Sequence, residues 1–139
     1  MTAYEEAYEQ ALKFLAVRFL SEGELRYKLQ LRQVREELID AVVETLQRED
    51  LLNDARLARA VYQYYARKGQ YGHAYIVNKL KKRKLSVPSD IYPVDEMAVA
   101  EQLLSRRFSG PSPDCRKLSR YLQNRGFSIS IIREILHRI

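Results

Sequence analysis

The chain has 139 residues and a formal net charge of +6, with 46% apolar residues but only 5 glycines and 4 prolines, a composition that indicates a folded, helix-rich protein and excludes disorder. The lone Cys115 excludes an internal disulfide, and no apolar run approaches the roughly 18 residues of a membrane span. Because the acidic start also lacks the order of a signal peptide, we expect a cytoplasmic protein with no membrane partner.

Apolar residues recur at helical spacing along the chain, and strand-like alternation is nowhere sustained. Ser21-Glu22-Gly23-Glu24 has the pattern of a capping box, which predicts a helix start at Ser21. Pro88 and Pro93 leave room only for a turn at 88–92. The expected helices span residues 3–20, 22–32, 35–49, 54–68, 72–84, 94–107, 113–125 and 128–138.

The sequence also repeats internally, with a register that recurs after 51 and then 42 residues. A unit of about 45 residues cannot bury its apolar face alone. We therefore expect an all-α protein of about three tandem three-helix repeats, at 1–50, 51–93 and 94–139, stacked into an elongated, curved array. A single compact helical bundle is the alternative. The equivalent positions hold Leu25, Ile76 and Leu118, then Leu29, Leu80 and Leu122, then Val34, Leu85 and Phe127.

Residues suited to catalysis or metal binding are sparse. His73 and His137 are the only histidines, and a zinc site needs more ligands than these and one cysteine can supply. The segment Gly69-Gln70-Tyr71-Gly72 lacks the Lys-Ser/Thr pair of a nucleotide-binding loop. We therefore expect a protein that is not an enzyme and has no catalytic residue, metal or cofactor.

The middle of the chain is basic and rich in tyrosine. Residues 55–89 hold nine Lys or Arg and no Asp or Glu, whereas residues 1–54 carry 7 basic and 12 acidic side chains. Such a segment favours a polyanion or an acidic protein surface, and exposed tyrosines can stack on unpaired bases. A solvated helix with half-buried tyrosines is the alternative, and Tyr64 and Tyr65 are expected in the core in either case. The candidate binding residues are Arg67, Lys68, Tyr71, Tyr75, Lys79, Lys82, Arg83 and Lys84.

Four strings are distinctive in combination. They are Ala11-Leu12-x-x-Leu15-x-x-Arg18-x-x-Ser21-Glu22-x-Glu24-Leu25-x-x-Lys28-Leu29, Leu51-Leu52-Asn53-Asp54-x-Arg56-Leu57-Ala58, Tyr71-Gly72-x-x-x-Ile76-x-x-x-Leu80 and Tyr121-Leu122-x-x-Arg125-Gly126-Phe127-Ser128. Together they resemble the RecX family of recombinase regulators, over nearly the whole chain.

The resemblance implies a protein of tandem three-helix repeats that binds the RecA filament on single-stranded DNA. It further implies that the protein lies in the filament groove and restrains the ATPase, strand-exchange and co-protease activities of RecA, with a role in recombination, DNA repair and the SOS response. The expected partners are therefore the RecA filament and single-stranded DNA, and the protein is expected to be a monomer. An independent DNA-binding helical module and a helical scaffold for an acidic partner are the alternatives.

The sequence departs from the family pattern at the ends of two helices. Gln33 and Lys84 stand where the family usually has the glycine seen here as Gly126. A left-handed residue other than glycine costs about 1 kcal/mol. We therefore expect the first two repeats to turn differently from the third.

Overall fold

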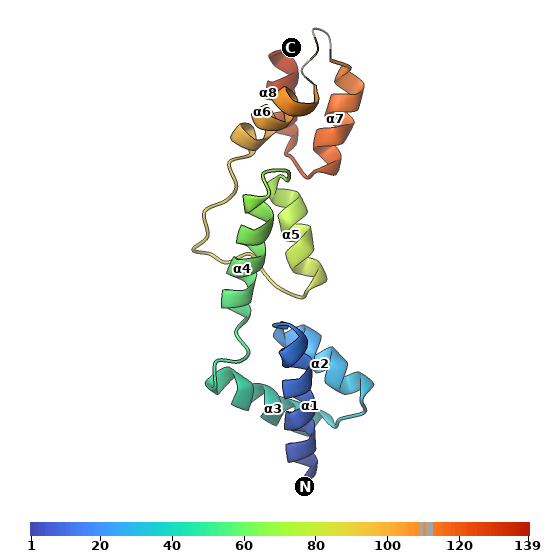
Figure 1. Cartoon of the computed structure of the whole chain (residues 1–139), viewed down its shortest axis with the longest axis vertical. Coiled ribbons are helices and arrows are strands. Elements are labelled where there is room, and N and C mark those ends of the chain that lie inside the picture. The colour runs from blue at the N-terminus through green and yellow to red at the C-terminus, as the bar shows by residue number, and fades with distance from the viewer. Residues whose placement is uncertain (109, 111–112) are drawn as a thin grey trace. The chain divides into compact units, whose positions relative to one another are not determined.

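The computed structural model describes residues 1–108, 110 and 113–139, and within them the chain is all-helical, as expected (Figure 1). The described helices are α1 (Ala3–Val17), α2 (Glu22–Leu31), α3 (Glu36–Arg48), α4 (Asp54–Arg67), α5 (His73–Lys82), α6 (Glu96–Arg107), α7 (Cys115–Asn124) and α8 (Ile129–His137).

The helix starts follow the caps that the sequence contains. Ser21 and Glu24 form the reciprocal bonds of a capping box at the start of α2, and Asp114 and Ser128 cap α7 and α8. The segment from the end of α5 to Glu96 contains a turn at 89–90 and no helix, as the two prolines predict. The middle repeat therefore has two helices where the first and last have three.

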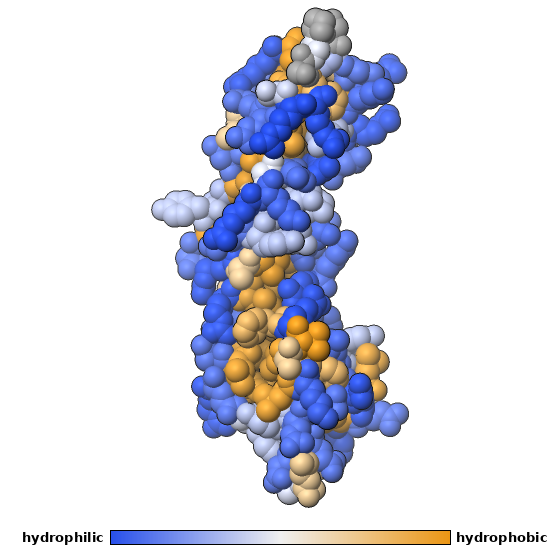
Figure 2. All heavy atoms as spheres, in the orientation of Figure 1, coloured by the Kyte–Doolittle hydropathy of each residue, from blue (hydrophilic) through white to orange (hydrophobic). Residues whose placement is uncertain are grey.

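The chain divides into two compact units. Unit 1 comprises Met1–Arg59 and Lys81–Ser86, and its main core is formed by α1, α2 and α3. Apolar residues also gather on the surface of this unit over α1 and α3 (Figure 2). The buried residues of the core are Ala7, Ala11, Leu20, Leu25, Leu29, Ile39, Val42, Val43, Leu46 and Leu52.

Unit 2 comprises Ala60–Leu80 and Val87–Ile139. Tyr62 of α4 is 1% exposed, and its hydroxyl accepts a hydrogen bond from the Val94 amide and lies 2.7 Å from Nδ1 of His73. The expectation that Tyr64 lies in the core is wrong, because its side chain is 56% exposed. Two residues along a helix correspond to a turn of about 200°, so burial of Tyr62 points Tyr64 towards solvent. A second core contains Ala100, Leu103, Leu118, Leu122, Phe127, Ile132 and Ile135.

The second helices of the three repeats end in the same way. Gln33, Lys84 and Gly126 all have left-handed backbone, with φ of 62°, 59° and 83°. The expectation that the first two repeats turn differently is therefore wrong. The apolar residue that follows each turn packs inward, since Leu85 and Phe127 are both 5% exposed and Val34 packs on the first core. Burial of this residue holds the non-glycine positions in a conformation that they would otherwise avoid.

Candidate functional site

Seven residues of unit 2 form a continuous surface of tyrosine rings and cations, which we call the tyrosine–cation surface. They come from the end of α4, the loop that follows it, α5 and the residue after α7. The loop turns at Gly69, whose φ of +63° suits glycine. The members are Tyr64, Tyr65, Lys68, Tyr71, Tyr75, Lys79 and Arg125.

The four tyrosines contact one another in a chain. The rings of Tyr71 and Tyr75 are parallel, with an interplanar angle of 2° and centroids 3.9 Å apart. Tyr65 meets both of them edge-on at 5.9 and 6.0 Å, and Tyr64 meets Tyr65 edge-on at 5.1 Å. The edge-on contacts have the separations and angles that aromatic pairs favour, so they restrain the orientation of neighbouring rings. Tyr64 is exposed and leaves part of its ring available to a ligand.

The cations lie against the rings. The ammonium of Lys79 is 5.2 Å from the ring centroid of Tyr75 and 5.8 Å from that of Tyr65. The ammonium of Lys68 lies 4.7 Å from the centroid of Tyr64. These separations are within the range of cation–π attraction, which restrains a lysine without neutralising it.

The electrostatic environment keeps this surface positive. A hydrogen bond with Tyr64, followed by the electrostatic interaction with the same side chain, raises the pKa of Lys68, so its ammonium stays charged. Burial, followed by the neighbouring Tyr75 hydroxyl, raises the pKa of Tyr71, so its phenol stays neutral. Among the contacts of the described residues, neither Lys68 nor Lys79 pairs with a carboxylate. The surface therefore offers uncompensated positive charge beside aromatic rings.

Arg125 joins the tyrosine–cation surface to a second aromatic group on the last repeat. Its guanidinium lies 5.4 Å from the ring centroid of Tyr71 and 5.0 Å from that of Tyr121, and it donates a hydrogen bond to Oε1 of Gln70. The guanidinium of Arg107 also lies near Tyr121, 5.2 Å from the centroid of its ring. Cations and rings thus continue from α4 to α7 within unit 2.

The structure separates the eight candidate residues into two groups. Lys68, Tyr71, Tyr75 and Lys79 are members of the tyrosine–cation surface. Sequence reasoning missed Arg125, although this residue lies in a quoted string and repeats the position of Arg83 after 42 residues. The other four candidates lie outside the surface: Arg67 and Lys82 are exposed at the ends of α4 and α5, and Arg83 and Lys84 belong to unit 1.

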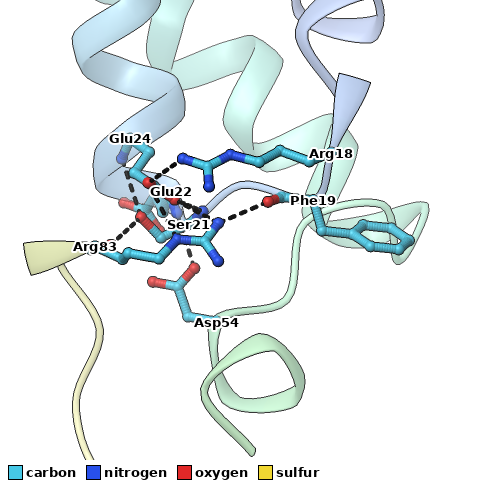
Figure 3. Close-up of polar contacts among 7 residues, drawn as sticks. All are labelled: Arg18, Phe19, Ser21, Glu22, Glu24, Asp54 and Arg83. Atoms are coloured by element: carbon cyan, nitrogen blue, oxygen red, sulfur yellow. Dashed lines mark hydrogen bonds and ion pairs between the residues drawn. The ribbon is translucent and has the colours of Figure 1, made fainter. Parts of the chain in front are cut away.

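The side chain of Arg83 binds the start of α2 (Figure 3). Its guanidinium donates to both carboxylate oxygens of Glu24, at 3.1 and 3.2 Å, and to the carbonyl oxygen of Phe19 at 2.8 Å. Burial raises the pKa of Glu24, but bonds from Arg83 and the Ser21 amide outweigh it, with help from Arg18, and the pKa lies below its usual value. This ion pair is structural, with side chains 22% and 15% exposed.

Lys84 packs against the same helix start. A Cβ added to Gly23 would lie 2.6 Å from Cδ of Lys84, so the aliphatic chain of the lysine fills the space that glycine leaves. The ammonium of Lys84 lies 5.1 Å from the ring centroid of Tyr27. Arg83 is therefore held in an ion pair, whereas Lys84 is exposed and its ammonium lies beside the Tyr27 ring in unit 1.

The described residues contain no group of three or more His, Cys, Asp or Glu side chains that could hold a metal ion. In the same part of the chain, no helix combines the length and the apolar character that crossing a membrane requires.

Comparison with known proteins identifies the family. The first three-helix domain of RecX matches residues 7–46, and the third three-helix domain of RecX matches residues 95–136. Regulatory protein RecX of Leptothrix cholodnii is 32% identical over 91% of this chain and 85% of its own length. The chain belongs to the RecX family. Regulatory protein RecX of Pseudomonas fluorescens is 33% identical over 91% of this chain and 86% of its own length.

Solved RecX structures share the fold. The crystal structure of RecX from Lactobacillus salivarius has a TM-score of 0.75 and 20% identity, covering 98% of this chain and 96% of that chain. A second crystal structure of regulatory protein RecX has a TM-score of 0.70 and 20% identity, covering 97% of this chain and 73% of that chain. The RecX domains and structures thus support the expected helical repeat array.

Proposed function

We propose that this chain regulates a RecA recombinase, mainly as an inhibitor, by binding the filament that RecA forms on single-stranded DNA. Membership of the RecX family supports a regulatory role. In this proposal the chain acts as a monomer without catalytic residues, and its three repeats at 1–50, 51–93 and 94–139 lie along the filament groove. The observation that carries the proposal is the tyrosine–cation surface, which suits single-stranded nucleic acid.

The chemistry of the tyrosine–cation surface matches an exposed DNA strand. Lys68, Lys79 and Arg125 are placed to neutralise phosphates, while the exposed ring of Tyr64 can stack on an unpaired base. Stacking of a base on an aromatic side chain contributes about 1–3 kcal/mol and tolerates any base. A protein held on the filament in this way competes with homologous DNA and favours the filament state that it binds more tightly. ATPase, strand-exchange and co-protease activities would all fall.

The test measures the single-stranded-DNA-dependent ATPase rate of the cognate RecA while the chain is titrated from well below one copy per RecA protomer. Inhibition at substoichiometric ratios is expected, because simple occupation of free DNA cannot produce it. Inhibition that only follows the amount of DNA sequestered would instead indicate an independent DNA-binding module. No inhibition together with a stable complex with an acidic protein would indicate a scaffold.

A charge-reversal variant links the activity to the tyrosine–cation surface. Lys68→Glu with Lys79→Glu should weaken inhibition at least about tenfold, since each change removes a cation and adds a repelling charge. The matched control reverses two exposed cations of unit 1, Lys13 and Arg48, and should inhibit as the parent chain does. Equal loss in both variants would show that net charge, rather than this surface, determines filament binding.

A further inference from the structure

Two contacts between successive repeats use equivalent residues, and in both an arginine carbonyl and a carboxylate accept hydrogen bonds from a helix start. In the first, the Ser21 hydroxyl donates to the carbonyl oxygen of Arg83 at 2.6 Å, and the Glu22 amide donates to Oδ1 of Asp54 at 2.8 Å (Figure 3). The start of one helix, α2, thereby docks on the start of α4 and the end of α5. All of these residues belong to unit 1.

The second contact repeats the first within unit 2. The Gly72 amide donates to the carbonyl oxygen of Arg125 at 2.8 Å, and the His73 amide donates to Oε1 of Glu96 at 2.9 Å. The donor positions lie 51 residues after those of the first contact and the acceptor positions lie 42 residues after. Each repeat from the second onward therefore presents a face that receives the first turn of a helix.

The same face exists on the first repeat, where no described helix start occupies it. Arg32 is equivalent to Arg83 and Arg125. Gln33 is equivalent to the left-handed residues Lys84 and Gly126. Ala3 is equivalent to the acceptors Asp54 and Glu96. Arg32, Gln33 and Ala3 line a cleft of about 440 Å³. The remaining lining residues are Glu6, Ala7, Gln10, Val34, Arg35 and Leu38.

The cleft supplies a guanidinium and a carboxylate, the two groups that the first occupied face uses. The guanidinium of Arg32 lies 5.5 Å from the ring centroid of Phe14, and among the described residues it makes no ion pair with a carboxylate. Arg83 at the equivalent position pairs with the third residue of the docked helix, Glu24. Glu6 lies one helical turn after Ala3 and provides a carboxylate for the amides of an incoming helix start.

We propose that this cleft receives the first turn of an α-helix from a partner protein, and that the helix begins with the pattern Ser-x-Gly-Glu. The serine corresponds to Ser21, whose hydroxyl donates to an arginine carbonyl. The glycine corresponds to Gly23, which lies against the side chain of Lys84. Gln33 is equivalent to Lys84, so its side chain leaves no room for a Cβ at the same position of the incoming helix. The glutamate corresponds to Glu24, because Arg32 stands where Arg83 binds it.

A second copy of the chain does not offer a free helix start of this kind, because its own Ser21 start is already docked on Asp54 and Arg83. The helix start of the last repeat, α7, is the equivalent donor element, and its sequence is Asp114-Cys115-Arg116-Lys117. Arg116 would occupy the position that requires glycine, and Lys117 would oppose Arg32 where a glutamate is needed. Bulk and charge therefore direct the cleft towards a different protein.

The probe for this proposal is a synthetic peptide of residues 19–31, which contains the pattern, with a covalent link between the exposed positions 27 and 31 to hold the helix. It is titrated into the full ¹⁵N-labelled chain. We expect saturable amide shift changes confined to residues 3–10 and 32–38. Shift changes elsewhere, or none at millimolar peptide, would overturn the proposal.

Three variants test the recognition chemistry. A peptide with Gly23→Leu and another with Glu24→Lys should each bind at least about tenfold more weakly, through overlap with Gln33 and repulsion from Arg32. Arg32→Glu in the chain should have a similar effect, while Lys13→Glu, at an exposed site outside the cleft lining, should not. Equal binding of the Gly23→Leu peptide would overturn the assigned fit. Self-association of the chain that Arg32→Glu abolishes would assign the cleft to a second copy instead.

Discussion

Gln33 carries a left-handed backbone conformation that normally selects glycine. Its φ is 62°, and its side chain is exposed. Gln33→Gly should therefore raise the free energy of unfolding by up to about 1 kcal/mol, because glycine adopts this conformation without the clash at Cβ. Urea denaturation with the midpoint and slope determined separately is the measurement.

Lys84 is the matched comparison for this prediction, since its φ is 59°. Lys84→Gly relieves the same backbone strain but loses the packing on Gly23 and the contact with the Tyr27 ring. It should therefore stabilise less than Gln33→Gly or destabilise the chain. A destabilised Gln33→Gly variant would show that the glutamine side chain contributes a contact that outweighs the strain.

The Glu24–Arg83 ion pair makes the free energy of unfolding depend on pH in the acidic range. Because the pKa of Glu24 is lowered in the fold, its contribution is fully present above the ordinary value of 4.5 and disappears as pH falls through the folded value. Glu24→Gln keeps an acceptor for the Ser21 amide but loses the charge. It should lower the free energy of unfolding at pH 7 by about 1–2 kcal/mol.

Urea denaturation of the Glu24→Gln variant and its parent at pH 7, 5 and 3 measures this effect. The difference between the two chains should shrink as the pH falls through the lowered pKa of Glu24, because the parent then also loses the charge at this position. Glu44→Gln, an exposed position on α3, is the control and should leave the profile unchanged. A difference of constant size at all three pH values would assign the loss to altered packing.

At the level of the helices, glycine permits the start of α5 to approach the end of α7. A Cβ on Gly72 would lie 2.4 Å from the carbonyl oxygen of Gly126. Gly72→Ala should therefore destabilise the chain by about 2–3 kcal/mol, because rigid backbone must move. Gly69→Ala is the control, with φ of +63° and no atom near the added Cβ, and should cost about 1 kcal/mol. Thermal unfolding of both variants gives the comparison, and equal losses would show that backbone strain alone matters.

The helices could be predicted from the sequence because caps and apolar spacing are local signals. Ser21 and its capping box placed the start of α2 within one residue. Apolar spacing predicts that the first helix reaches residue 20, whereas α1 ends at Val17 because Arg18 already has extended backbone that leads into Ser21. No local signal reports this, because hydrophobic spacing continues through Phe19, which is 61% exposed in the structure.

The tyrosine–cation surface could be predicted only in part for the same reason. Lys68, Tyr71, Tyr75 and Lys79 lie close in sequence, so charge and helical spacing are sufficient to group them. Arg125 lies 54 residues after Tyr71, whose ring it contacts, and joins the group through the fold. Arg83 carries the same charge as Lys79, but its contact with Glu24, 59 residues away, assigns it a structural role. Partial burial and an ion pair, rather than charge, therefore distinguish Arg83 from Lys79.

Across the whole molecule, the distribution of charge predicts how naked DNA binding responds to salt. The basic residues lie mostly after residue 54, and the tyrosine–cation surface contributes Lys68 and Lys79 without carboxylate partners. Binding of single-stranded DNA releases about 0.7 counterions for each phosphate that a cation neutralises. Lys68→Ala with Lys79→Ala should therefore make the slope of log K against log salt less steep by about 1.4. Fluorescence anisotropy with a labelled oligonucleotide of mixed sequence, between about 50 and 200 mM salt, measures the slope.

The control for the salt experiment removes the same number of charges from unit 1, with Lys13→Ala and Arg48→Ala. Both residues are exposed and lie in the acidic first repeat, where DNA contacts are not expected. The control should keep the parent slope while its net charge changes by the same amount. Equal slopes in all three chains would mean that Lys68 and Lys79 do not touch phosphate. A smaller slope in both variants would mean that DNA responds to the total charge of the molecule rather than to one surface, and the filament contacts would then have to be sought on another face.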